Sequence, residues 1–246
     1  SVSGGDDKTR YLLSGNFVDQ KGIVINSGFK RSNARINLER DLWPNLTVGL
    51  STIFGKSTQH SLTTTEPVNY NSSPYSAGIT NSLTYALFMP PVVPIYTNTG
   101  AFNYTNPYEY AYFALGSKAA NPVSDLKNSV AETISNTLMA NFFAKYHISD
   151  ELVAKATVGT SVNNATQNFF APSYTSLGLA EKGIGAVGNK RNEVLQSEFT
   201  LNYAKKIGKA HFIDLLAGYT HQQTSLNFAT SIASRFTNES LKHNNL

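Results

Sequence analysis

The most constraining feature of this sequence is a strict alternation of short turns with much longer connections. Short turns are predicted at 41–45, 147–150 and 205–209. Longer connections lie at about 58–127, 171–190 and from 222 onward, with a moderate one near 19–28. Outer-membrane β-barrels are built this way, with tight turns on one side of the membrane and long loops on the other. The pattern therefore favours an all-β, antiparallel, up-and-down transmembrane barrel.

The segments between these connections alternate apolar and polar residues, as half-buried strands do. In one segment Leu138, Ala140 and Phe142 share a face opposite Thr137 and Asn141. We predict strands at about 9–19, 29–41, 46–57, 128–147, 150–170, 191–205 and 209–225, with a long loop at 58–127. All belong to one partial barrel domain over 1–246. Seven or eight strands cannot close a barrel of the roughly 22-strand class, so other strands must complete the sheet.

Alternation alone leaves open where the apolar face points. A soluble sandwich turns it into a core, and a barrel turns it toward lipid. Lipid is favoured by small residues such as Ala140 and Ala154 on this face, by Trp43 and Tyr146 near short turns, and by the strand length. The polar face of a barrel lines its lumen. The predicted lumen-facing residues are Arg35, Asn37, Glu39, Asn141, Lys155, Glu198 and Asn202.

Composition and local motifs argue against other kinds of function. The chain has no cysteine, its five histidines lack metal-binding spacing, and we predict no metal site and no cofactor. The basic residues behind the net charge of +4 are scattered, so nucleic-acid binding is not expected. The run 183–188 spells G-x-G-x-x-G but leads into a strand pattern, and we expect a surface loop there. No catalytic constellation is present, so we predict that the chain is not an enzyme.

Several segments resemble SusC/RagA-type TonB-dependent outer-membrane transporters of Bacteroidetes. The resemblance runs from about residue 9 to 225 and rests on the order and spacing of short motifs. These motifs are Tyr11–Ile23 with Ala34–Leu38, Asn45–Gly49, Pro90–Tyr96 with Gly100, Asn136 and Asn141 with Tyr146–Ile148, Leu201–Tyr203, Gly208–His211 and Leu216–Tyr219.

The resemblance implies a middle segment of an importer barrel in the outer membrane of a Gram-negative bacterium. Such importers take up oligosaccharides or peptides and work with a SusD-like surface lipoprotein. No counterpart of the family's plug or TonB box is recognised in this sequence. The implied partners are therefore the remainder of the barrel and its plug, TonB through a region absent here, and outer-membrane lipid.

One loop concentrates aromatic residues that could contact a ligand. Flat rings with a polar edge stack on sugars and grip peptide backbones at low entropic cost. The predicted substrate-binding residues are Tyr96, Phe102, Tyr104, Tyr108, Tyr110 and Tyr112. The same rings could instead pack the loop against its neighbours. Two other functions remain open, a surface β-sandwich binding module of the adhesin kind and a passive porin.

Overall fold

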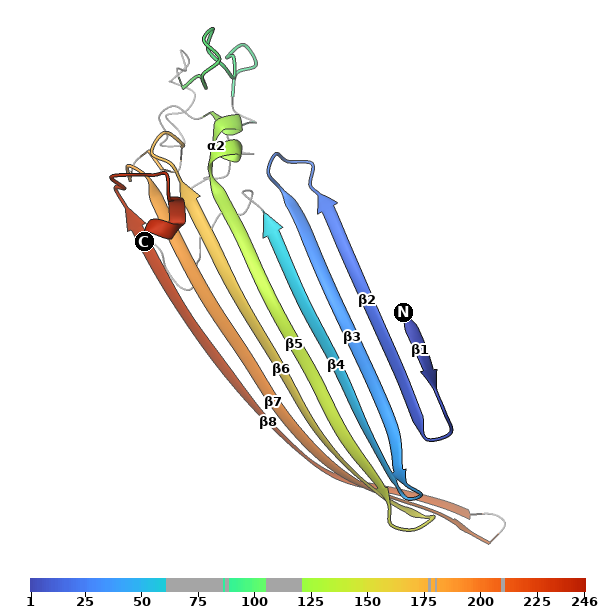
Figure 1. Cartoon of the computed structure of the whole chain (residues 1–246). Coiled ribbons are helices and arrows are strands. Elements are labelled where there is room, and N and C mark those ends of the chain that lie inside the picture. Colours follow the sequence, from blue (N-terminus) through green and yellow to red (C-terminus); the bar gives the residue numbers. More distant parts are fainter. Residues whose placement is uncertain (61–85, 87–88, 105–120, 177, 180, 209–210) are drawn as a thin grey trace.

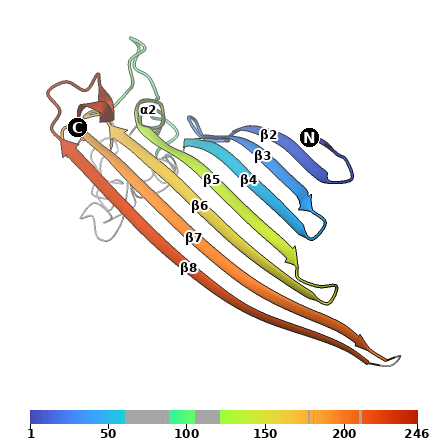
Figure 2. The ribbon, with the colours of Figure 1, turned by 60° about the horizontal axis from the view of Figure 1, so that its bottom comes forward.

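The computed structural model describes residues 1–60, 86, 89–104, 121–176, 178–179, 181–208 and 211–246. These residues form one antiparallel eight-stranded sheet in which every strand pairs with its neighbours in sequence, from β1 to β8. The strands are β1 (Val2–Gly5), β2 (Thr9–Lys21), β3 (Gly28–Trp43), β4 (Leu46–His60), β5 (Val130–His147), β6 (Leu152–Ala171), β7 (Ile184–Ile207) and β8 (His211–Ser234). The helices are α2 (Pro122–Asn128) and the short 3-10 helix η3 (Lys242–Asn245). Figures 1 and 2 show a single curved, twisted sheet with an open edge at each side.

The predicted all-β, up-and-down architecture is confirmed, with three corrections to its details. A short strand, β1, precedes the first one expected from the sequence. The G-x-G-x-x-G run was expected to be a loop, but Ile184–Gly188 forms the start of β7. The connection expected from 222 onward was also wrong, because β8 continues to Ser234. Backbone pairing explains both extensions. β7 and β8 pair without interruption, from Ile184 opposite Ser234 to Ile207 opposite His211.

Short and long connections lie at opposite ends of the sheet, which we call the turn end and the loop end. The turns after β3, β5 and β7 gather at the turn end, as their alternation in the sequence predicted (Figure 1). A fourth short turn, between β1 and β2, joins them there. In that turn the Asp6 carboxylate accepts hydrogen bonds from the amides of Lys8 and Thr9 at 2.8 and 2.7 Å. These bonds lower the pKa of Asp6.

The apolar face of the sheet has no second layer of structure against it. Ladder register places Phe54, Leu138 and Val162 side by side on this face. Two rows nearer the turn end, the same face carries Leu50, Phe142 and Val158. The side chains of Phe54, Phe142 and Val158 are 50%, 49% and 50% exposed. No second sheet occurs among the described residues. The sandwich alternative fails, because a sandwich would bury these side chains in a core.

Buried apolar side chains in the described part gather at the loop end instead. The cluster contains Phe169, Ala171, Ile184 and Ala186, from the paired ends of β6 and β7. Phe170 lies beside it and meets Phe236 edge-on, with ring centroids 5.4 Å apart. Within the described ranges, no helix is long and apolar enough to cross a membrane.

A lipid-facing apolar surface makes a directional prediction for charged substitutions. Ala140 and Met139 are neighbours on opposite faces near the middle of β5. Ala140→Arg should lower the free energy of unfolding from a bilayer by about 2–4 kcal/mol, the usual cost of a cation near the midplane. Met139→Arg is the matched control and should cost much less. Denaturant titration of the full-length protein in liposomes would measure both, and equal costs would contradict the orientation.

Candidate functional site

A small hairpin at the loop end brings two of the predicted aromatic residues together. Its strands meet in a bridge between Tyr96 and Phe102, and their ring centroids lie 5.1 Å apart. The Asn103 amide donates to the Ile95 carbonyl at 2.9 Å, which closes the hairpin. Gly100 sits in the turn with φ of +82°, a conformation that side chains beyond glycine rarely adopt. The turn therefore holds the two rings side by side.

Asn121 fastens this hairpin to α2. Its side-chain amide donates to the carbonyls of Ile95 and Asn103, each at 2.9 Å. Its side-chain oxygen accepts from the Ser124 amide at 3.1 Å and so caps the helix N-terminus. Asn121 is only 2% exposed, so its donors and acceptor are used inside the fold. One buried amide thus positions the aromatic hairpin on the helix.

The rings continue from the hairpin to the connection that follows β6. Phe102 lies 6.5 Å from Tyr104, and Tyr104 lies 6.1 Å from Tyr174, measured between centroids. We call these residues, with Tyr96, the loop-end aromatic cluster. The Tyr104 hydroxyl is hydrogen-bonded to the Ser124 hydroxyl at 2.5 Å. Tyr96 and Tyr174, at the two ends, are 41% and 44% exposed.

Lys127 places a positive charge at the Tyr96 end of the cluster. Its ammonium donates to the Tyr96 hydroxyl at 3.0 Å and lies 5.7 Å from the ring centroid. The cluster therefore combines partly exposed aromatic rings with a cation and hydroxyl groups. Such a surface can stack on a flat ligand and hydrogen-bond its polar edge.

A buried carboxylate connects α2 to the connection after β6. Asp125 is 2% exposed, and its oxygens accept from the amide of Ser176 at 3.0 Å and from the Ser176 hydroxyl. Burial raises the pKa of Asp125, and the two bonds from Ser176 oppose that rise only in part. Burial likewise raises the pKa of Tyr104. The link fixes the position of Tyr174, which lies two residues before Ser176.

The structure brings together three of the six predicted ligand-binding aromatics, Tyr96, Phe102 and Tyr104. Tyr108, Tyr110 and Tyr112 lie outside the described residues. Tyr174 completes the cluster, but sequence reasoning missed it. It lies 70 residues beyond Tyr104 in a different connection, and only its lone aromatic character in a polar segment could have pointed to it.

All seven predicted lumen residues lie on one face of the sheet, opposite the apolar one. Asn37 pairs with Ser51 across the β3–β4 ladder, and Ser51 pairs with Asn141 across the next. The Asn37 side-chain oxygen accepts from Arg35 at 3.2 Å and from Ser51 at 2.8 Å. One row further toward the turn end, a continuous ladder of pairs joins Glu39 to Glu198. Lys155 and Asn202 complete the set on this polar face.

An aromatic ring covers a glycine on the same polar face. A Cβ atom added to Gly49 would lie 2.2 Å from the Phe143 ring, and the Lys155 ammonium lies 5.2 Å from that ring's centroid.

The described residues hold no group of three or more side chains that could bind a metal ion.

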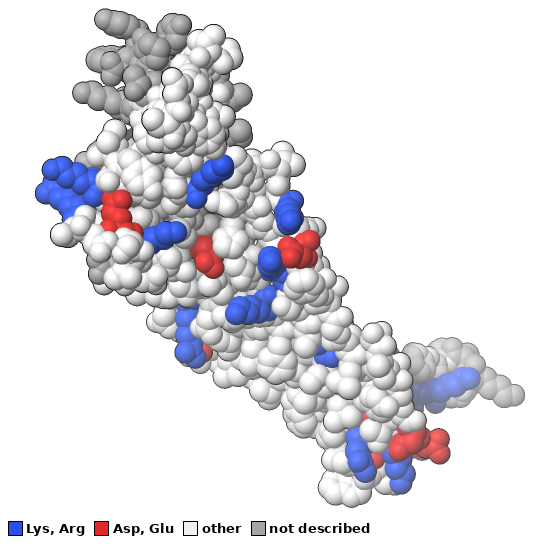
Figure 3. Space-filling model, turned by 45° about the horizontal axis from the view of Figure 1, so that its top comes forward, with Lys and Arg blue, Asp and Glu red and all other residues white. Residues whose placement is uncertain are grey.

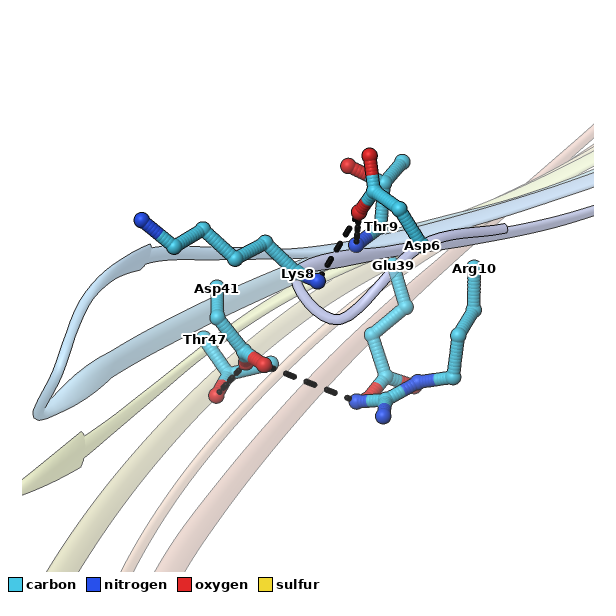
Figure 4. A network of polar contacts seen from close by, with 7 residues as sticks. All are labelled: Asp6, Lys8, Thr9, Arg10, Glu39, Asp41 and Thr47. Atoms are coloured by element: carbon cyan, nitrogen blue, oxygen red, sulfur yellow. Dashed lines mark hydrogen bonds and ion pairs between the residues drawn. The ribbon is translucent and has the colours of Figure 1, made fainter.

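A network of charged side chains lies on the polar face at the turn end (Figure 4). Arg10 on β2 reaches Glu39 at 2.7 Å and Asp41 at 3.9 Å, both on β3. The hydroxyl of Thr47, at the start of β4, donates to Asp41 at 2.7 Å. The network therefore ties three consecutive strands together, although exposed ion pairs contribute only about 0–1 kcal/mol each.

Comparison with known proteins connects this geometry to a family. The chain is 30% identical over its whole length to TonB-dependent receptor P3 of Formosa agariphila, of which it covers 23%. Its homologues are TonB-dependent receptors. TonB-dependent receptor SusC of Bacteroides thetaiotaomicron is 23% identical over 92% of the chain, which covers 22% of SusC. The chain thus spans about a quarter of the length of these relatives, and no family model matches it.

Solved structures support the same fold. The RagAB peptide importer in its closed-closed state matches 97% of this chain with a TM-score of 0.72, at 19% identity over 25% of that protein. At that identity the match concerns the fold, and it confirms that the open sheet is a segment of a transmembrane barrel. These relatives are receptors and transporters rather than enzymes, which favours the prediction of a non-enzymatic chain.

The Gly49–Phe143 contact predicts an overpacking defect. Gly49→Val should displace the Phe143 ring and lower the free energy of unfolding by about 1–3 kcal/mol. Phe143→Ala in the same chain should recover most of that loss, which denaturant titration would measure. Gly15→Val is the control, because a Cβ at Gly15 meets only the Asn33 carbonyl oxygen, at 3.8 Å. Equal destabilisation at both glycines would contradict the role of the ring.

The raised pKa of Asp125 predicts that acid tightens the loop end. Its folded-state pKa lies above the ordinary 3.8. The stabilisation by protonation is therefore complete below that ordinary value and is lost as pH rises through the folded-state pKa. Hydrogen exchange at the Ser176 amide, corrected for intrinsic rates, should show more protection at acidic pH. Asp125→Asn stays neutral and should abolish the dependence, and a dependence that persists in this variant would contradict the assignment.

Proposed function

We propose that the chain is part of a TonB-dependent outer-membrane importer for oligosaccharides or peptides. The observation that carries the proposal is a single, long-stranded sheet with an uncovered apolar face, in a chain whose homologues are TonB-dependent receptors. The apolar face would contact the outer-membrane lipid. The rest of the barrel would pair with the two open edges of the sheet, because unpaired strands cannot face lipid.

The polar face would line the import path. It carries positive charge at Arg35 and Lys155 and negative charge at Glu39 and Glu198. Interspersed charges of both signs suit a hydrated wall that also contacts a plug. Most of these residues would therefore hold water or support the plug, and a few would contact the passing substrate.

The loop-end aromatic cluster would meet the ligand before it enters the barrel. The exposed rings of Tyr96 and Tyr174 offer faces for stacking on a sugar or on a peptide bond. Tyr104 has a different role, since its hydroxyl is already bound to Ser124. It would anchor the cluster to α2, so that the two outer rings keep a fixed spacing.

The proposed partners follow from the same family. TonB would act through a region outside this chain, and a SusD-like lipoprotein would close over the loop end. The names of the relatives support dependence on TonB, and the RagAB structures are those of a peptide importer. Dependence on TonB distinguishes this proposal from a passive porin, which needs no energy-coupling partner.

Removal of the two exposed rings tests the ligand role. In the full-length protein, Tyr96→Ala with Tyr174→Ala should weaken binding of the transported oligosaccharide or peptide about tenfold, the loss of two modest stacking contacts. Calorimetric titration against a panel of both ligand classes would measure the affinity. Tyr11→Ala, at the turn end, is the matched control because it removes an equally exposed ring far from the cluster. Unchanged affinity in the double variant would contradict the role of the cluster.

A further inference from the structure

The apolar face ends in a row of polar side chains that the proposed import path does not use. Ladder register places Lys56, Asn136, Asn164 and Arg191 side by side on β4 to β7. One row nearer the turn end, Phe54, Leu138, Val162 and Glu193 occupy the corresponding positions. All four polar residues are exposed. Polar groups on a face that is otherwise apolar require a polar environment at that level.

The row lies at the height where the headgroups of a membrane begin. Tyr146 marks the turn end of the apolar stretch on β5, and Asn136 lies ten residues before it. Ten residues extend about 33 Å along a strand, or about 25 Å along the membrane normal at the usual tilt of barrel strands. That height matches the apolar band of an outer-membrane barrel, which is about 25 Å tall. In such a barrel Lys56 and Arg191 would lie near the headgroup layer on the loop-end side.

A groove of about 700 Å³ follows this boundary across the sheet. Its lining combines Lys56, Asn136, Asn164 and Arg191 with the apolar side chains of Phe54, Leu138 and Val162. Charged side chains on the face drawn in Figure 3 gather toward the loop end and at the turn end, with few between. The groove is cationic on its loop-end side and apolar on its turn-end side, which matches an amphiphile with an anionic head.

The groove carries two cations, Lys56 and Arg191, and one carboxylate, Glu193, is paired with Arg191. Arg191 donates through Nε to Glu193 at 2.8 Å and through Nη2 to the same oxygen. No described residue forms an ion pair with Lys56, and Asp19 is already paired with Lys30 at 3.2 Å. A guanidinium carries five N–H donors, so Arg191 keeps donors for a second anion. Lys56 and Arg191 lie three strand spacings apart, about 14 Å, with two amide side chains between them.

We propose that this groove binds a phosphate-bearing lipid of the outer leaflet. Lys56 and Arg191 would bind the phosphate groups, Asn136 and Asn164 would hydrogen-bond the headgroup, and the acyl chains would cover Phe54 and Leu138. The inference rests on the proposed function in taking the apolar face as lipid-facing and the loop end as the outer side of the membrane. It goes further by assigning a specific site to that face.

Titration with a phosphorylated lipid tests the proposal in the full-length protein. Native mass spectrometry in detergent would follow binding of diphosphorylated lipid A. Each cation near a membrane surface changes binding about fivefold, so K56Q with R191Q should weaken it about thirtyfold. E193Q frees Arg191 and removes a repelling charge, so it should tighten binding about fivefold. R31Q is the matched control, because Arg31 lies beside Ser32 on the opposite face of β3 and should leave binding unchanged.

Three results would overturn the proposal. Equal affinity of the wild type and the double variant would show that the cations are not used. A loss of about fivefold in R31Q, the amount expected for any single cation, would show that only net charge matters. Inorganic phosphate that binds as tightly as the lipid would show that the apolar part of the groove contributes nothing.

Membrane fractionation and nutrient uptake of the same variants separate this inference from the proposed function. A protein that never enters the outer membrane would contradict the proposed function. Normal membrane location and uptake with no difference in lipid binding would contradict only the lipid site.

Discussion

The hydrogen-bond ladder between neighbouring strands is the constraint on which the rest of this structure depends. Within lipid an unpaired backbone group costs several kcal/mol, so every strand must find its partners within the sheet. Seven consecutive antiparallel pairings meet that need from β1 to β8. Among the described residues β8, which is 24 residues long, pairs with β7 alone, so its other side needs a further strand. The open sheet therefore makes sense as part of a closed barrel.

The same ladder divides the side chains between two faces of the sheet, one apolar and one polar. Side chains alternate across a strand, so one register places the apolar residues on one face and the polar residues on the other. This is why the described part of the chain has no apolar core along most of the sheet. Its buried apolar cluster lies at the loop end, where Phe169 and Ile184 are covered. Apolar side chains pack against one another at this end, beyond the stretch of the sheet whose apolar face is uncovered.

The loop end uses buried polar groups where the sheet uses backbone pairing. Asn121 and Asp125 are each 2% exposed, and both join segments that are far apart in the sequence. Such bonds are costly to break because the remaining partner stays buried without water. The aromatic cluster therefore sits on a fixed base, which is what a ligand-contacting surface requires. Tyr96 and Tyr174 stay partly exposed at its two ends, and Tyr104 is bound to α2 through Ser124.

The sequence by itself determined the architecture, because period-two alternation and turn spacing are local properties. The strand around Leu138–Tyr146, three of the four short turns and the two faces could all be predicted from it. The start of β7 at Ile184 and the end of β8 at Ser234 could not, since these two segments form strands by pairing with each other. Tyr174 likewise joined the aromatic cluster through the Asp125–Ser176 link. Only the tertiary structure could decide these contacts, because they join residues whose local sequence carries no signal of the partner.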